Sequence, residues 1–134
     1  MGRRTARLAA ATLVLGVLAA GCTDEQRKQL SPTCAIAQTA VDDAQRQAEN
    51  AIATISEDPA TARRTLTAVK TALSAAKATV SGDERAQLEN AEQAVADLLA
   101  QARRSTTGRP VDGAVVTEAR EGLLAAVKGV RADC

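Results

Sequence analysis

Three cysteines, Cys22, Cys34 and Cys134, are the most reactive side chains in this sequence of 134 residues. Cysteine pairs form disulfides, bind soft metals or exchange electrons, and a redox-active pair usually occupies a short Cys-x-x-Cys motif. The sequence contains no such motif, because its two nearest cysteines are separated by 11 residues. A redox-active pair is therefore disfavoured, and the pairing of the cysteines depends on where the mature chain begins.

Acidic residues are the second group that could do chemistry, as metal ligands or as general acids and bases. They cluster in three adjacent pairs, which are Asp42-Asp43, Glu57-Asp58 and Asp83-Glu84. Neighbouring side chains on a helix point about 100° apart, so an adjacent pair does not converge on one ion. We interpret these pairs as solvated or helix-capping groups and expect no metal site among them.

A catalytic site of another kind is also disfavoured, because the chain contains no histidine. Di-iron bundles need Glu-x-x-His pairs beside further glutamates, and nucleophilic hydroxyls commonly need an adjacent base. The glutamates that a di-iron site would use are Glu49, Glu89, Glu92 and Glu121. The hydroxyls that we interpret as lacking an activating partner are Ser74, Ser105 and Thr106. The sequence therefore predicts no enzyme activity, no catalytic residue and no cofactor.

Composition argues against nucleic-acid binding. The chain has no Phe, Trp or Tyr, and its formal net charge is only +1. Nucleic-acid sites combine basic patches with aromatic side chains on which bases stack. We therefore expect no nucleic-acid partner.

The amino-terminal segment has the three parts of a secretory signal peptide. Arg3, Arg4 and Arg7 make its start basic, an apolar stretch covers Leu8–Ala20, and small residues precede Cys22. The apolar stretch is about 13 residues long, whereas a membrane-spanning helix needs roughly 20. Residues 1–21 are therefore predicted to be a cleaved signal, with an uncleaved anchor as the alternative.

The last five residues of this segment, Leu18-Ala19-Ala20-Gly21-Cys22, resemble the lipobox of bacterial lipoproteins. The leucine lies one position earlier than is commonest in that family. The resemblance covers residues 1–22 and implies that Cys22 carries a diacylglyceryl group and becomes the new amino terminus. It further implies that the protein is held at the extracytoplasmic face of the cell membrane through this lipid, whereas an ordinary secretory signal would release it.

Removal of residues 1–21 would take away three arginines and change the formal charge from +1 to −2. A chain with this slight negative charge has no basic patch that would hold it to anionic lipid. The lipid on Cys22 is thus the expected membrane contact. Residues 22–31 are polar and are predicted to be a short tether to a domain at 32–134.

Apolar residues recur at helical spacing in four segments of that domain, at about 32–56, 59–80, 82–104 and 112–132. Ser31-Pro32 and Asp58-Pro59 each place a side-chain cap before a proline, a typical helix start. Ser81 and Glu84 have the spacing of a capping box, which would start the third helix. Matched helix lengths and short turns predict an all-α fold, an antiparallel up-down-up-down four-helix bundle. The alternatives are helical hairpins that assemble as an oligomer, or a continuous helix through residues 81 and 82.

Each segment has an apolar seam that is expected to face the core. In the first segment the seam is Ile36, Ala40, Ala44, Ala48, Ala51 and Ile55, with Val41 and Ile52 beside it. The other seams are Ala62, Leu66, Val69, Leu73, Ala76 and Val80; Glu84, Leu88, Ala91, Val95, Leu98 and Ala102; and Val116, Ala119, Leu123, Ala126 and Val130. Gly122 and Gly129 flank the last seam, and we expect them to allow close packing of a neighbouring helix.

With Cys22 assigned to the lipid, Cys34 and Cys134 remain as a pair in an oxidising compartment. In a four-helix up-and-down bundle the start of the first helix and the end of the last lie at the same end. We therefore predict a disulfide between Cys34 and Cys134, with an intermolecular bridge or free thiols as the alternatives.

Together these features predict a membrane-anchored extracytoplasmic lipoprotein with no catalytic function. Its expected role is protein interaction or structural support at the cell envelope, with an envelope protein as the partner. The alternative is a carrier that holds a small apolar ligand or lipid between its helices.

Overall fold

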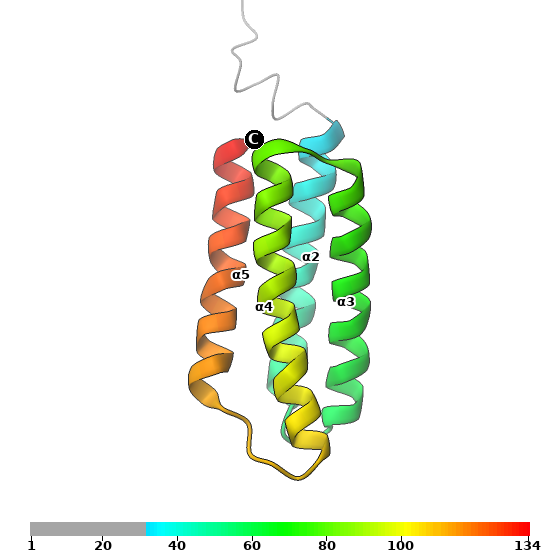
Figure 1. The fold of residues 1–134 in the computed structure, drawn as a ribbon, viewed down its shortest axis with the longest axis vertical. Coiled ribbons are helices and arrows are strands. Elements are labelled where there is room, and N and C mark those ends of the chain that lie inside the picture. Colours follow the sequence, from blue (N-terminus) through cyan, green and yellow to red (C-terminus); the bar gives the residue numbers. More distant parts are fainter. Residues whose placement is uncertain (1–31) are drawn as a thin grey trace, which may run out of the picture.

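The computed structural model describes residues 32–134, which form four helices and no strand (Figure 1). The helices are α2 (Pro32–Thr54), α3 (Pro59–Thr79), α4 (Gly82–Thr106) and α5 (Gly113–Asp133). They run alternately up and down and pack side by side as the predicted antiparallel bundle, with α2 against both α3 and α5. The expected signal segment, Cys22, the tether and the Ser31 cap lie outside the described residues.

The seams of α3, α4 and α5 are buried as predicted, except at Glu84, which is half-buried. In α2 the prediction was wrong at Ile36, which is 40% exposed, and at Ala40, which is only partly buried. Residues spaced by four drift about 40° around a helix at each step, so the predicted row leaves the core after several steps. The buried seam of α2 instead follows alternating steps of three and four: Cys34, Ala37, Val41, Ala44, Ala48, Ala51 and Ile55.

The helix ends follow the predicted capping chemistry at Asp58 but not at Ser81. The Asp58 carboxylate accepts a hydrogen bond from the Thr61 backbone N–H at 3.1 Å. The pKa of Asp58 is lowered first by a hydrogen bond with the Thr61 side chain and then by this backbone bond. Ser81 precedes α4, but its hydroxyl makes no capping hydrogen bond, so the predicted capping box is not formed. Gly82 has a φ of +65°, a conformation that glycine adopts without steric cost. The first helix ends at Thr54, two residues earlier than predicted, and α4 extends to Thr106, two residues later.

The two glycines of α5 lie against α4, as the close-packing prediction requires. A Cβ built on Gly122 would lie 3.5 Å from the Ala94 Cβ, an ordinary van der Waals separation. A Cβ built on Gly129 would lie 2.4 Å from the Gln87 Cδ, so the end of that side chain would have to move. Close packing therefore depends on glycine at position 129, where a methyl group would displace Gln87, whereas Gly122 has space for one.

We expect Gly122→Ala to raise the free energy of unfolding by up to about 1 kcal/mol, because alanine is the better helix former and the methyl group has space. Gly129→Ala is the matched comparison and should gain less, since it displaces Gln87. Urea unfolding followed by circular dichroism measures both values. A larger gain in the free energy of unfolding for Gly129→Ala than for Gly122→Ala would contradict the conclusion that a methyl group fits only at position 122.

Candidate site at the disulfide end of the bundle

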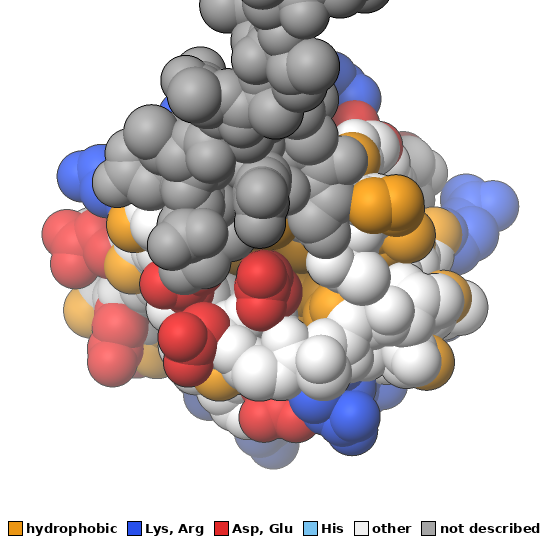
Figure 2. All heavy atoms as spheres, turned by 90° about the horizontal axis from the view of Figure 1, so that it is seen from above, with side chains coloured by type: hydrophobic (Ala, Val, Ile, Leu, Met, Phe, Trp, Pro, Cys, Tyr) orange, Lys and Arg blue, Asp and Glu red, His pale blue; other side chains and the backbone are white. Residues whose placement is uncertain are grey.

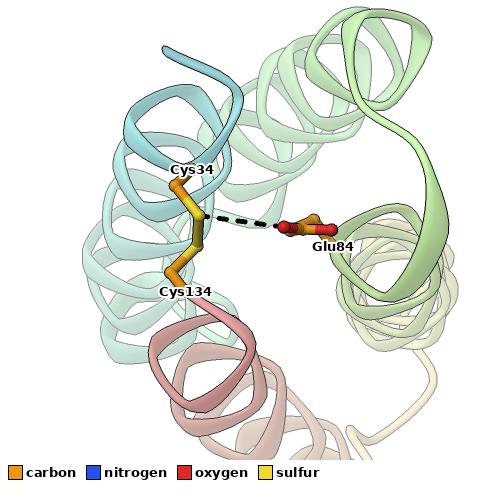
Figure 3. A group of neighbouring side chains, drawn as sticks. All are labelled: Cys34, Glu84 and Cys134. Carbon is orange, nitrogen blue, oxygen red and sulfur yellow. Dashed lines mark hydrogen bonds between the residues drawn. A yellow bond between two sulfur atoms is a disulfide. The ribbon is translucent and has the colours of Figure 1, made fainter. Parts of the chain in front are cut away.

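Cys34 and Cys134 meet at the end of the bundle where α2 begins and α5 ends (Figure 3). Their sulfur atoms are 2.10 Å apart and their Cα atoms 5.7 Å apart, so the structure contains a disulfide between them. Both cysteines are almost fully buried. The bond joins residues 100 positions apart and closes nearly the whole described chain into one loop.

Glu84, in the first turn of α4, points toward this disulfide (Figure 3). Its Oε1 atom lies 3.7 Å from the Cys34 Sγ, and one carboxylate oxygen and both sulfurs all lie within 4.8 Å of one another. A disulfide sulfur carries no proton, so this is a contact without a hydrogen-bond donor. Within residues 32–134, Glu84 forms no ion pair. Within this described part of the chain, a half-buried carboxylate thus faces two sulfurs with no basic side chain paired to it.

The other candidate carboxylates do not converge on a common point. Glu49 forms an ion pair with Arg120 on α5, and Glu89 forms one with Arg85 one turn earlier on α4. Asp42 pairs with Arg131 at 3.2 Å. These acidic residues therefore serve local electrostatics, in agreement with the solvated roles predicted for the adjacent acidic pairs.

Glu92 is the exception, because it joins α3 to α4 through two partners. Its carboxylate accepts hydrogen bonds from the Ser74 hydroxyl and the Lys77 ammonium group. Burial raises the pKa of Glu92, but the bonds from Lys77 and Ser74 outweigh burial and hold the pKa below its usual value of 4.5. Ser74 and Lys77 also have Ser-x-x-Lys spacing, which the sequence analysis overlooked.

This Ser74–Lys77–Glu92 cluster is suited to packing more than to catalysis. Ser74 lies inside α3, where backbone N–H groups are used within the helix and cannot stabilise an oxyanion. Lys77 donates to the Glu92 carboxylate and forms an ion pair with it across the two helices. The cluster therefore fixes the position of α3 against α4.

We expect Glu92→Gln to lower the free energy of unfolding by about 1–3 kcal/mol at pH 7, because it leaves Lys77 without its charged partner. Since the pKa of Glu92 is lowered in the folded state, its contribution is present above the unfolded value near 4.5 and is lost as pH falls through the folded value. Urea unfolding at pH 7 and at about pH 3 measures the difference. Glu89→Gln is the matched control, since Glu89 lies one turn away and is 53% exposed. An equal effect of the two substitutions at pH 7 would rule out this role.

Gln101 is a buried polar residue that the sequence analysis also missed. It is 6% exposed, and its side-chain oxygen accepts a hydrogen bond from the Asp112 backbone N–H at 2.8 Å. Asp112 in turn caps α5 by accepting from the backbone N–H groups of Ala114 and Val115. Gln101 therefore fixes the loop between α4 and α5. The only sign of this role in the sequence is the position of Gln101 within the apolar seam region.

An apolar groove lies on the outside of the bundle, close to the disulfide end. It has a volume of about 390 Å³ and is lined by Ala35, Ile36, Thr39, Ala40 and Ala76, which belong to α2 and α3. Its largest side chain, Ile36, is the one that the predicted seam placed wrongly in the core. Seen from this end, acidic side chains gather toward the left of the face, with some hydrophobic ones among them, and a larger hydrophobic patch appears at the upper right (Figure 2).

These features define a disulfide-closed, antiparallel four-helix bundle. Comparison with protein-family models, with curated proteins and with solved structures found no match. None of the helices in residues 32–134 combines the length and apolar character needed to cross a bilayer.

Proposed function

We propose that this protein is a lipoprotein anchored through Cys22 at the extracytoplasmic face of the cell membrane, where its bundle serves as a non-catalytic interaction or structural module. The observation that carries the proposal is the order of basic residues, short apolar stretch and Gly21-Cys22 junction in residues 1–22. A diacylglyceryl group supplies two acyl chains, which is enough for stable anchoring.

The fold supports this proposal by constraining how the bundle would lie. The described chain begins at Pro32, ten residues after Cys22, and ten extended residues reach at most about 36 Å. The disulfide end, where α2 begins, would therefore lie within about 36 Å of the anchor. The loop between α4 and α5, at the opposite end of the bundle, could lie farther away. Partners at the envelope would meet the long sides of the bundle or this loop.

The anchor is tested by the intact mass of the protein extracted from membranes and by cell fractionation. The mature chain should begin at Cys22 with the mass of a diacylglyceryl group, and Cys22→Ser should lose that mass and leave the membrane fraction. Thr23→Ser, a conservative change at the next residue, should remain in the membrane fraction. An unmodified chain that begins elsewhere would refute the proposal.

The interaction role is tested by crosslinking in living cells. A photoreactive residue at Leu124, which is 39% exposed on α5, should give a discrete crosslinked product in the membrane fraction. The product should disappear when Cys22→Ser is added, because the bundle is then no longer held beside its partner. Failure to obtain a product from Leu124 and from positions on the other three helices would count against an envelope partner.

The apolar groove at Ile36 favours a second candidate function, the binding of a small apolar ligand or lipid. The groove lies between α2 and α3 on the surface, whereas the sequence predicted a ligand inside the bundle. A fluorescent fatty acid should bind the full chain with a dissociation constant that Ile36→Ser raises at least several-fold. Leu124→Ser is the matched control, because Leu124 is almost equally exposed and lies outside the groove. Equal binding by both variants would exclude the groove as the ligand site.

A further inference from the structure

The arrangement of Cys34, Cys134 and Glu84 has a second use once the disulfide is opened. Two thiolates and a carboxylate are a ligand set that divalent cations such as Zn²⁺ and Cd²⁺ bind strongly. In the oxidised protein the sulfurs are bonded to each other and are not available as anionic ligands. Any cation binding by all three groups therefore requires the reduced state.

We propose that reduction of the Cys34–Cys134 disulfide converts this end of the bundle into a binding site for one thiophilic divalent cation, with both cysteine thiolates and the Glu84 carboxylate as ligands. The proposal goes beyond the anchoring function and does not depend on it. The site would offer three protein ligands and leave a fourth position for water.

The positions of the three groups fit this coordination. Tetrahedral Zn²⁺ with Zn–S bonds near 2.3 Å and a Zn–O bond near 2.1 Å places sulfur and oxygen about 3.6 Å apart. The Cys34 Sγ and the Glu84 Oε1 are 3.7 Å apart in the structure. Two thiolates on one Zn²⁺ are about 3.8 Å apart, and rotation of the side chains can reach this separation from Cα atoms 5.7 Å apart.

Electrostatics supports the same conclusion. Glu84 is half-buried beside the sulfurs, and residues 32–134 provide it with no basic partner. A divalent cation would offset two of the three negative charges that this carboxylate and the two thiolates carry. Acidic side chains also gather on one side of this end of the bundle (Figure 2), so the local field favours a cation.

The chemical step is a two-electron thiol–disulfide exchange with a dithiol as the reductant. The dithiol breaks the bond between Cys34 and Cys134, forms its own disulfide, and transfers two protons to the cysteine sulfurs. Binding of the cation then displaces both protons to solvent. An oxidant that restores the disulfide would remove two of the three ligands and release the cation.

The test uses the full chain in detergent with Cys22→Ser, so that the only thiols are those of Cys34 and Cys134. The protein is reduced with dithiothreitol, freed of the reductant without oxygen, and checked for two thiols per chain before titration with Cd²⁺. We expect charge-transfer absorption from cadmium–thiolate bonds to reach its limit at one Cd²⁺ per chain. The oxidised protein should show none.

Glu84→Gln tests the carboxylate ligand, and Asp83→Asn is its matched control, since it removes the same charge from the neighbouring residue. We expect Glu84→Gln to weaken Cd²⁺ binding at least 10-fold and Asp83→Asn to change it less than 3-fold. Equal affinities in the two variants would overturn the proposal, as would one Cd²⁺ shared between two chains.

Circular dichroism keeps the result interpretable if reduction loosens the fold. Cd²⁺ should raise the melting temperature of the reduced protein, because a cation that binds only the folded arrangement stabilises it. Cd²⁺ should raise the melting temperature of the reduced Glu84→Gln variant much less. Cd²⁺ binding by an unfolded chain with no gain in helicity would show ordinary thiol chemistry and would overturn the proposal.

Discussion

Replacing Cys34 and Cys134 together by serine should lower the free energy of unfolding by about 4 kcal/mol, the largest effect on stability that we expect from any of the changes proposed. Chain entropy assigns on the order of 4.7 kcal/mol to closing a loop of 100 residues, and measured effects of native disulfides commonly reach 2–5 kcal/mol. The loss falls on a small domain with a thin core, whose total stability is expected to be only about 5–15 kcal/mol.

Urea unfolding under non-reducing conditions measures this loss, with the full chain and its double variant compared in the same detergent. The control is Cys22→Ser, which removes a cysteine without opening the loop and should leave the stability unchanged. A loss below about 1 kcal/mol in the double variant would show that the bond contributes little to stability.

Leu98→Ala should lower the free energy of unfolding by about 3 kcal/mol, because it removes one of the few large side chains in the core. Leu98 is fully buried in α4, which contacts all three other helices. Alanine is the commonest residue of this core, with 11 of its 27 members, and its side chain is too short to fill the space left behind. We therefore expect a cavity that does not collapse, and a cost within the usual range for such a change.

Leu124→Ala is the control for this prediction, since Leu124 has the same side chain but is 39% exposed on α5. It should change the free energy of unfolding by less than about 0.5 kcal/mol, as is typical of surface positions. Thermal unfolding by calorimetry measures both variants. Similar losses for Leu98→Ala and Leu124→Ala would show that the assigned core is incorrect.

The sequence predicted the number of helices and most of the core because their signals are local. Asp58-Pro59 combines a cap with a residue that starts helices, and the Leu and Val residues of α3 to α5 repeat at heptad spacing. The seam of α2 was harder to assign, because alanines occur on several of its faces and carry little directional information. We predicted Ile36 to lie in the core because its apolar side chain is large. The structure buries the smaller side chains of Cys34 and Ala37 instead.

The candidate site depended on tertiary information that no single segment contains. Glu84 has capping spacing relative to Ser81, and only the packing of α4 against α2 shows that its carboxylate faces Cys34. The Ser74–Lys77–Glu92 cluster required the register of α3 against α4. Its Ser-x-x-Lys spacing was visible in the sequence, but the carboxylate that joins the two residues was not.

The bond between Cys34 and Cys134 makes the polypeptide between them a covalent ring. A ring has no internal terminus, so one cut in the loop between α4 and α5 would leave every helix attached to the rest. The same topology allows the order of the helices along the gene to be permuted, with new ends at that loop and a short peptide link in place of the disulfide. The described bundle is thus defined by which of its four helices lie next to one another around the ring, and the order in which the chain passes through them is one choice among several.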